Sequence, residues 1–321
     1  MKSSPILTKS ALLLVGVAVA AVTLIILFSS SPEAPSGAVA QVEPAVFEPI
    51  KIAKPDREEI TSALRPSLAR GLGLTENASA SERLSLLYDM PDDLSETENQ
   101  AVLSTLLAPR QKGDADGWHA EYLHSLCLLL QRSSPEPDLF CRGLLTLAYD
   151  TARPLVVRDY AIQHLTRFYA SPLAVDHRAM IVSAILLLAE PGSKISPTAL
   201  LAVHLLGPEG HLNPSAPPSE PLVSDGEFTS ILTSVLASPA ASTSNSMTAL
   251  RIIADRQLDH YRPELHQIIA DEKTPALVRA SALGTLSSLE NPEDKQFIES
   301  LPPSNHPLLA HAVSHAQAAI K

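Results

Sequence analysis

The sequence predicts an all-α fold in which short antiparallel helix pairs stack along an axis, preceded by one transmembrane helix. Three observations support this prediction. Leu and Ala dominate the apolar residues, while aromatic residues make up only 4% of the 321 residues, a balance that favours helices over sheets. The 27 prolines exclude long unbroken helices and favour many short ones. Two segments far apart in the chain also repeat the same helical pattern.

The chain begins with an apolar segment that has the length of a membrane-spanning helix. Lys2 and Lys9 precede the segment 11–28, ALLLVGVAVAAVTLIILF. Thr23 is its only polar side chain. As a helix, these 18 residues would span about 27 Å, which is close to the hydrocarbon thickness of a bilayer. Because basic residues favour the cytoplasmic side, we expect residues 1–10 in the cytoplasm and the body outside it, in the periplasm of a bacterium.

A cleaved signal peptide is the alternative interpretation of this segment. The tripeptide Ala38–Ala40 has the small-x-small form of a cleavage site, so the body would be secreted after cleavage near Ala40. That site lies well downstream of the apolar run, and the run is longer than the usual core of a signal peptide. Residues 29–55 are rich in Pro, Ala, Ser and Glu, and we interpret them as a linker to a helical repeat domain at 56–321.

The body is acidic, which argues against a nucleic-acid partner. The net charge of the chain is −11, and residues 1–28 hold two lysines and no acid, so the remainder has 22 basic and 35 acidic side chains, or −13. Binding to a nucleic-acid backbone requires a basic surface. The two cysteines are too few for a disulfide-rich scaffold.

The segments RPLVVRDYAIQHLTRFY (153–169) and TPALVRASALGTLSSLENPEDKQF (274–297) share one helical pattern. Each has a proline where a helix begins, followed by Val, Ala and Leu on one helix face. The arginine lies off this apolar stripe and can point to solvent or to a carboxylate of the next unit. The matched pairs are Pro154 with Pro275, Val157 with Val278, Arg158 with Arg279, Ala161 with Ala282, Ile162 with Leu283, Leu165 with Leu286, and Phe168 with Leu289.

The pattern Pro-x-x-Val-Arg-x-x-Ala-x-x-x-Leu, at 154–165 and 275–286, resembles the HEAT-repeat (armadillo-like α-solenoid) family. The two copies lie 121 residues apart, about three units of roughly 40 residues, which is the period of stacked helical hairpins. The resemblance is good at 153–169 and 274–300, partial from 173 to 257, and thin before residue 116. It implies a fold but no particular function, since the family includes adaptors, lyases and scaffolds. An irregular helical bundle is the alternative fold.

Apolar periodicity predicts further helices around these two copies. Pro66 should divide the first of them, and Ser95 with Glu98 predicts a capping box that opens the third. The segment 207–225 has five prolines and two glycines, and we interpret it as a long loop, either functional or a tolerated insertion. The predicted helices lie near 56–70, 80–90, 95–108, 117–132, 136–151, 175–190, 196–207, 228–239, 245–258 and 306–320.

No catalytic or metal-binding motif is complete, and we expect no cofactor. KGDADGW at 112–118 lacks the carboxylates that a calcium loop needs at its first and last positions. His311 and His315 could share a helix face, but the sequence shows no four-ligand set for zinc. Asn77 begins a glycosylation sequon, which matters only in a eukaryotic secretory protein.

Cys127 and Cys141 fall on consecutive predicted helices, on either side of a turn near 133–137. Outside the cytoplasm they could form a disulfide that closes a short loop, worth roughly 3 kcal/mol in the chain-entropy model. Two buried thiols that pack as small apolar side chains are the alternative.

These features together predict a membrane-anchored binding scaffold rather than an enzyme. The second helices of successive hairpins would form an inner surface that binds a protein or peptide. Arg158, Arg251 and Arg279 would tune its specificity. One alternative is a purely structural spacer, and another is an enzyme with a site beside the 207–225 loop that uses His204, His211 and Asp225.

Overall fold

Every regular element among the described residues is a helix, and these residues contain no strand, which confirms the all-α prediction. The predicted membrane segment 11–28, the linker 29–55 except residue 50, Asn77 and most of the 207–225 loop lie outside the described residues. The structure, a computed structural model, describes residues 50, 61–75, 78–109, 116–133, 136–206 and 223–319.

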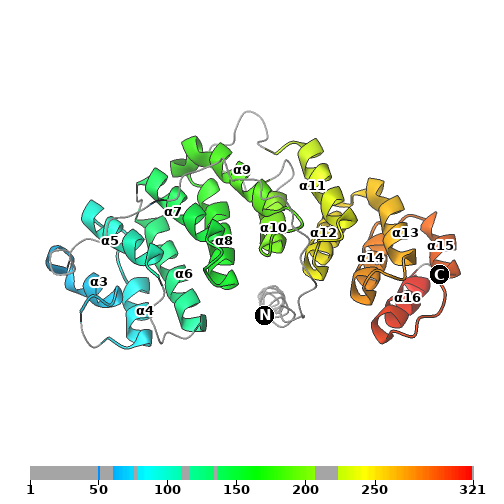
Figure 1. The fold of residues 1–321 in the computed structure, drawn as a ribbon, viewed down its shortest axis with the longest axis horizontal. Coiled ribbons are helices and arrows are strands. Elements are labelled where there is room, and N and C mark those ends of the chain that lie inside the picture. Colours follow the sequence, from blue (N-terminus) through cyan, green and yellow to red (C-terminus); the bar gives the residue numbers. More distant parts are fainter. Residues whose placement is uncertain are drawn as a thin grey trace, which may run out of the picture. The chain divides into compact units, whose positions relative to one another are not determined.

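The helices alternate along the chain between two layers, here called the A helices and the B helices (Figure 1). Helix α3 (Pro66–Gly71) comes first, and the 3-10 helices η1 (Pro172–His177) and η2 (Asp259–Tyr261) lead into α9 and α13. The A helices are α5 (Glu96–Leu107), α7 (Pro137–Tyr149), α9 (Arg178–Leu188), α11 (Asp225–Ala237), α13 (Arg262–Ala270) and α15 (Asp294–Ser300). The B helices are α4 (Ala80–Tyr88), α6 (Asp116–Arg132), α8 (Leu155–Tyr169), α10 (Ser196–Leu206), α12 (Thr243–Arg256), α14 (Ala276–Ser288) and α16 (Pro307–Ala319).

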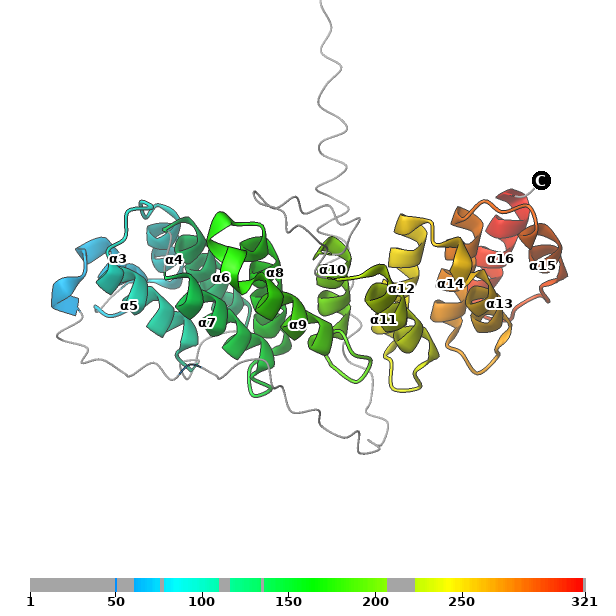
Figure 2. The same ribbon diagram turned by 90° about the horizontal axis from the view of Figure 1, so that it is seen from above.

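Each A helix packs against the B helix that follows it, and each B helix packs against the next B helix along the chain. The two views show the same order of helices from α3 to α16 (Figure 2). This is the stacking of helix pairs that the repeated pattern predicts, because each pair covers the apolar side of its neighbour.

The apolar stripes of the two repeated segments face the interior, as predicted. In α8, Val157 and Leu165 have exposed fractions of 2% and 0%. In α14, Val278 and Leu286 have exposed fractions of 4% and 1%. Removing such a leucine from a packed core costs about 2–5 kcal/mol, so these stripes supply much of the stacking free energy.

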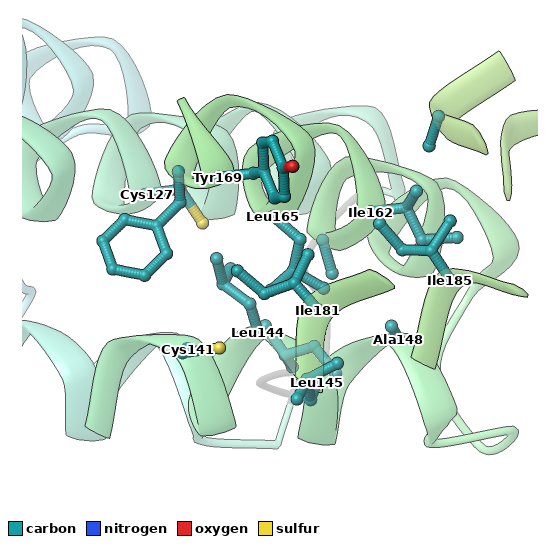
Figure 3. Packing of buried hydrophobic residues seen from close by; sticks show 14 of the residues in the cluster. Cys127, Cys141, Leu144, Leu145, Ala148, Ile162, Leu165, Tyr169, Ile181 and Ile185 are labelled. Carbon is teal, nitrogen blue, oxygen red and sulfur yellow. The ribbon is translucent and has the colours of Figure 1, made fainter. Parts of the chain in front are cut away.

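The apolar core continues from α7 through α8 to α9. Leu144 and Leu145 of α7 pack with Ile162 of α8 and with Ile181 and Ile185 of α9, all completely or almost completely buried (Figure 3). A branched aliphatic residue at each of these positions fills the space between three helices, which keeps their axes in register.

The arginine of the repeated pattern does not face solvent, contrary to one expectation from the sequence. Arg158 is 7% exposed, and its Nε donates to the carbonyl oxygen of Ala148 at 2.8 Å. Arg279 is half-buried, and its Nε donates to the carbonyl of Ile269 at 2.8 Å. In both units the acceptor lies ten residues earlier, in the last turn of the preceding A helix. The guanidinium group thus donates to a carbonyl in the last turn of the A helix, where carbonyls lack a partner within the helix. This is also the negative end of the dipole of that A helix.

Local signals placed several helix ends correctly. Pro66 begins α3 and separates it from the helical residues 61–63, and Ser95 with Glu98 forms the predicted capping box of α5. Helix α13 lies between the predicted helix 245–258 and the repeated segment 274–297, and the sequence did not predict it. The long loop ends before the predicted residue 225, because Ser224 is the N-cap of α11 and forms a second capping box with Glu227.

No single helix among the described residues has both the length and the hydropathy of a membrane span. The pair made of Leu155–Tyr169 and Pro172–Leu188 meets the length and composition criteria only when joined across a bend of 113°. Half of the residues in these two segments are buried.

Candidate functional site

A chain of polar and aromatic side chains crosses the B helices from α4 to α10, and we call it the B-helix polar cluster. Its members are Tyr88 of α4, Glu121 and His124 of α6, Tyr160, His164 and Asp159 of α8, and Thr198 of α10.

The first link of the cluster joins α4 to α6. The hydroxyl of Tyr88 donates to Oε1 of Glu121 at 2.7 Å, and Tyr88 itself is 42% exposed. Partial burial, together with the neighbouring carboxylate, raises the pKa of Tyr88 above its ordinary value. The ring therefore presents an apolar face to solvent while its hydroxyl is held by Glu121, a combination common at protein interfaces.

The second link joins α6 to α8 through two histidines. Nδ1 of His124 and Nε2 of His164 lie 3.0 Å apart, and the ring of Tyr160 stacks at a tilt with its centroid 5.0 Å from that of His124. The other ring nitrogen of His164 is buried and has no hydrogen-bond partner. Because an unpaired N–H would cost more there than a bare lone pair, we assign the proton to Nε2 of His164, which donates it to His124.

Burial keeps this histidine pair neutral. His164 is 1% exposed, and burial, followed by the charges of His124 and Arg167, lowers its pKa to about 3. Burial also lowers the pKa of His124, although Glu121 opposes this shift. Two neutral imidazoles joined by one hydrogen bond fix the register of α6 against α8.

The third link joins α8 to α10. The hydroxyl of Thr198 donates to Oδ1 of Asp159 at 2.8 Å. Burial raises the pKa of Asp159 to about 6, while the Thr198 hydroxyl and the charge of Arg158 pull it in the opposite direction. Acid–base groups with shifted pKa values are common at functional sites, and five members of the cluster on adjacent B helices have such shifts, namely Tyr88, His124, Asp159, Tyr160 and His164.

The polar side chains of the cluster bond to one another across neighbouring helices. Among the described residues, no three His, Cys, Asp or Glu side chains lie close enough to hold a metal ion. The hydrogen bonds of Glu121, His164 and Asp159 are made within the protein, between neighbouring helices.

The three arginines predicted to bind a partner occupy different environments. Arg158 is buried, and its Nε donates to the carbonyl oxygen of Ala148. Arg279 is half-buried, and its Nε donates to the carbonyl oxygen of Ile269. Arg251 lies on α12 with 62% of its side chain exposed and pairs with Asp255 at 3.5 Å, which leaves it accessible on the B-helix side.

Cys127 of α6 and Cys141 of α7 are free thiols, and both belong to the same buried apolar cluster (Figure 3). Burial raises the pKa of Cys141 to about 12 and that of Cys127 further still. Thiolates are the reactive form of cysteine, so both groups are chemically inert in this environment.

Two of the three residues proposed for an enzyme beside the 207–225 loop, His204 and Asp225, lie among the described residues. His204 is 7% exposed, and its Nδ1 accepts from Nε of Arg256 at 2.8 Å. Asp225 is an exposed residue in the first turn of α11. His211 lies outside the described residues.

Sequence reasoning missed the histidine pair, although a signal for it was present. His124 and His164 are 40 residues apart, and Asp159 and Thr198 are 39 apart. These separations equal about one repeat unit, so aligning the B helices by unit would have placed the two histidines at equivalent positions.

Comparisons with known proteins identify no family for this chain. No protein-family model matches it, and no curated protein matches it. Among solved structures, human deoxyhypusine hydroxylase in complex with glycerol aligns with 82% of this chain and 96% of its own, at 14% identity and a TM-score of 0.30.

Proposed function

We propose that this protein is a membrane-anchored, extracytoplasmic HEAT-like scaffold that binds a protein or peptide partner on its B helices. One observation carries the proposal, namely that the B helices pack side by side and the B-helix polar cluster runs across four of them. In stacked-repeat proteins such a continuous row of helices is the usual binding surface.

The HEAT-like assignment rests on a contact repeated in register. Arg158 and Arg279 occupy the same position of the sequence pattern, and each donates to a carbonyl ten residues earlier. Repetition of one arginine–carbonyl bond in separate units supports a series of homologous helix pairs.

The membrane anchor rests on the sequence alone. The apolar run at 11–28, preceded by Lys2 and Lys9, supports a cytoplasmic N-terminus and an extracytoplasmic body. After an alkaline wash, the full-length chain should remain in the membrane pellet. Release of the full-length chain into the wash would contradict the anchor.

The partner surface can be tested with matched charge reversals in the full-length chain, purified from its native envelope. Arg167→Glu with Arg251→Glu changes exposed residues on B helices α8 and α12. Lys194→Glu with Lys295→Glu makes the same change of charge on exposed residues away from the B helices. Quantitative mass spectrometry then compares what co-purifies.

We expect the first pair to reduce the recovered partner at least tenfold and the second pair to leave it unchanged. Two results would overturn the proposal. The intact chain could recover nothing above background, or the two pairs could reduce recovery equally.

A further inference from the structure

We infer that a groove between A helices α5 and α7 receives a lysine or arginine side chain of a partner protein. This groove lies on the A helices and goes beyond the B-helix surface proposed above. Its volume is about 250 Å³, which is below the range of pockets for drug-sized ligands and fits a single long side chain.

The floor of the groove is apolar. Leu94, Leu103 and Leu139 line it, and the first two are buried in the core. Helices α5 and α7 approach closely beside it, since a Cβ atom at Gly143 would lie 2.9 Å from Cδ1 of Leu103. The floor is therefore rigid, and it can pack the aliphatic stem of a lysine or arginine side chain.

The rim of the groove is acidic. Glu96 begins α5, Glu136 is the N-cap of α7, and both side chains are exposed. Oε1 of Glu96 accepts from Nε2 of Gln100 at 3.3 Å, which orients one carboxylate along the groove wall. The helix dipoles explain why carboxylates are stable at these two helix ends, but not why both line the same groove.

The two rim carboxylates lack the basic partners that nearby acids have. Asp93 and Glu98 pair with Arg65 at 3.1 and 2.6 Å, and Asp92 pairs with Arg132 at 3.0 Å. Asp138, one turn into α7, pairs with Arg142 at 3.0 Å. Within the part of the chain that the structure describes, neither Glu96 nor Glu136 forms an ion pair, so the groove offers two negative charges to a cation from outside.

The test uses N-acetyl-arginine-N-methylamide as a probe for the side chain, added to the full-length chain in detergent. Methyl NMR of labelled leucines reports on Leu94, Leu103 and Leu139 directly. The norleucine amide of the same form supplies the apolar stem without a charge. The glutamate amide supplies the opposite charge. Far-UV circular dichroism confirms that each variant remains folded.

We expect saturable shifts of these three leucines with the arginine probe and none with the two control amides. Glu96→Gln with Glu136→Gln should weaken binding about tenfold, whereas the matched change of exposed Glu272 and Glu290 to Gln should leave it unchanged. Glu96→Lys with Glu136→Lys should abolish arginine binding and allow the glutamate probe to bind instead.

Three results would each overturn the inference. The arginine probe could fail to shift these leucines, it could act no better than the norleucine probe, or it could bind equally well to the Gln variant. Because the probe is one amino acid, none of these results bears on capture of a partner by the B helices.

Discussion

At the scale of single residues, buried polar groups serve mainly to join one helix to another. The Nε of Arg158 donates to the carbonyl oxygen of Ala148, so that a charged donor takes the place of water at the end of α7. Hydrogen bonds that involve a charged group contribute about 1.5–3 kcal/mol, and loss of the donor would leave a buried carbonyl unpaired. A pattern position that looks like a binding residue in the sequence therefore acts as a structural contact between helices.

The histidine pair predicts that acid destabilises the fold. The pKa of His164 is lowered to about 3, whereas an unfolded histidine has a pKa of about 6.5. The unfolded chain thus binds a proton that the folded chain excludes. Stability from this group is complete above pH 6.5 and falls as the pH drops towards the folded value. Between pH 6.5 and 5, the loss should be about 2 kcal/mol.

Urea unfolding of the wild type and of His164→Gln at pH 7.5 and pH 5.0 measures this loss. Glutamine keeps an amide donor near His124 but does not titrate, so the variant should lose about 2 kcal/mol less than the wild type between the two pH values. If both proteins lose the same stability over this interval, His164 is not the titrating group.

At the scale of elements, serine caps determine where several helices begin. Ser79, Ser95, Ser224 and Ser242 each accept a backbone N–H from the first turn of the following helix. Ser95 and Ser224 complete capping boxes with Glu98 and Glu227. These signals are local in sequence, so they can be recognised without tertiary structure.

The cap of α11 offers a matched pair of substitutions in one helix. Ser224→Ala should cost about 1 kcal/mol, because the N–H of Glu227 loses its acceptor. Ser230→Ala, at an exposed position within the same helix, should be neutral or slightly stabilising, since alanine has the higher helix propensity.

Hydrogen exchange of the amides of α11 reports on both substitutions. Loss of protection in the Ser224→Ala variant alone supports the role of the cap. Equal effects of the two substitutions would mean that the N-terminus of α11 is held by packing instead.

At the scale of the whole described body, the apolar core divides into two clusters. Ile252 and Ile253 of α12 belong to the first cluster, whereas Leu250 of the same helix belongs to the second, which continues through α13 to α16. In repeat proteins each unit is stabilised mainly by its nearest neighbours. A substitution in one cluster should therefore lower the local stability of the helices in that cluster most.

Leu286→Ala tests this division, because Leu286 is 1% exposed and lies in the second cluster. Amides of α13 and α14 should lose about 2–4 kcal/mol of protection against hydrogen exchange, while those of α7 and α8 should change much less. Leu165→Ala, the matched residue of the first cluster, should show the reverse pattern. Uniform loss of protection across the body in either variant would show that the two clusters unfold as one unit.

The sequence by itself determined the helical class, the stripe Val157, Ala161 and Leu165, the break at Pro66, and the capping box of Ser95. Each of these depends on residues within about one to three helical turns of one another, where the 3.6-residue period and the needs of helix ends act directly. Helix α13 was not predicted because its short apolar stripe, Leu265 and Ile269, lies between two polar segments and does not repeat the pattern of the clearer units.

Only the tertiary structure decided which side chains meet across helices. The bond of His124 to His164, the burial of Arg158 and the groove edged by Glu96 and Glu136 all join different helices. Periodicity shows which face of a helix is buried. It does not show the offset between stacked units, and this offset, set by how side chains of several helices pack together, determines which residues lie opposite each other.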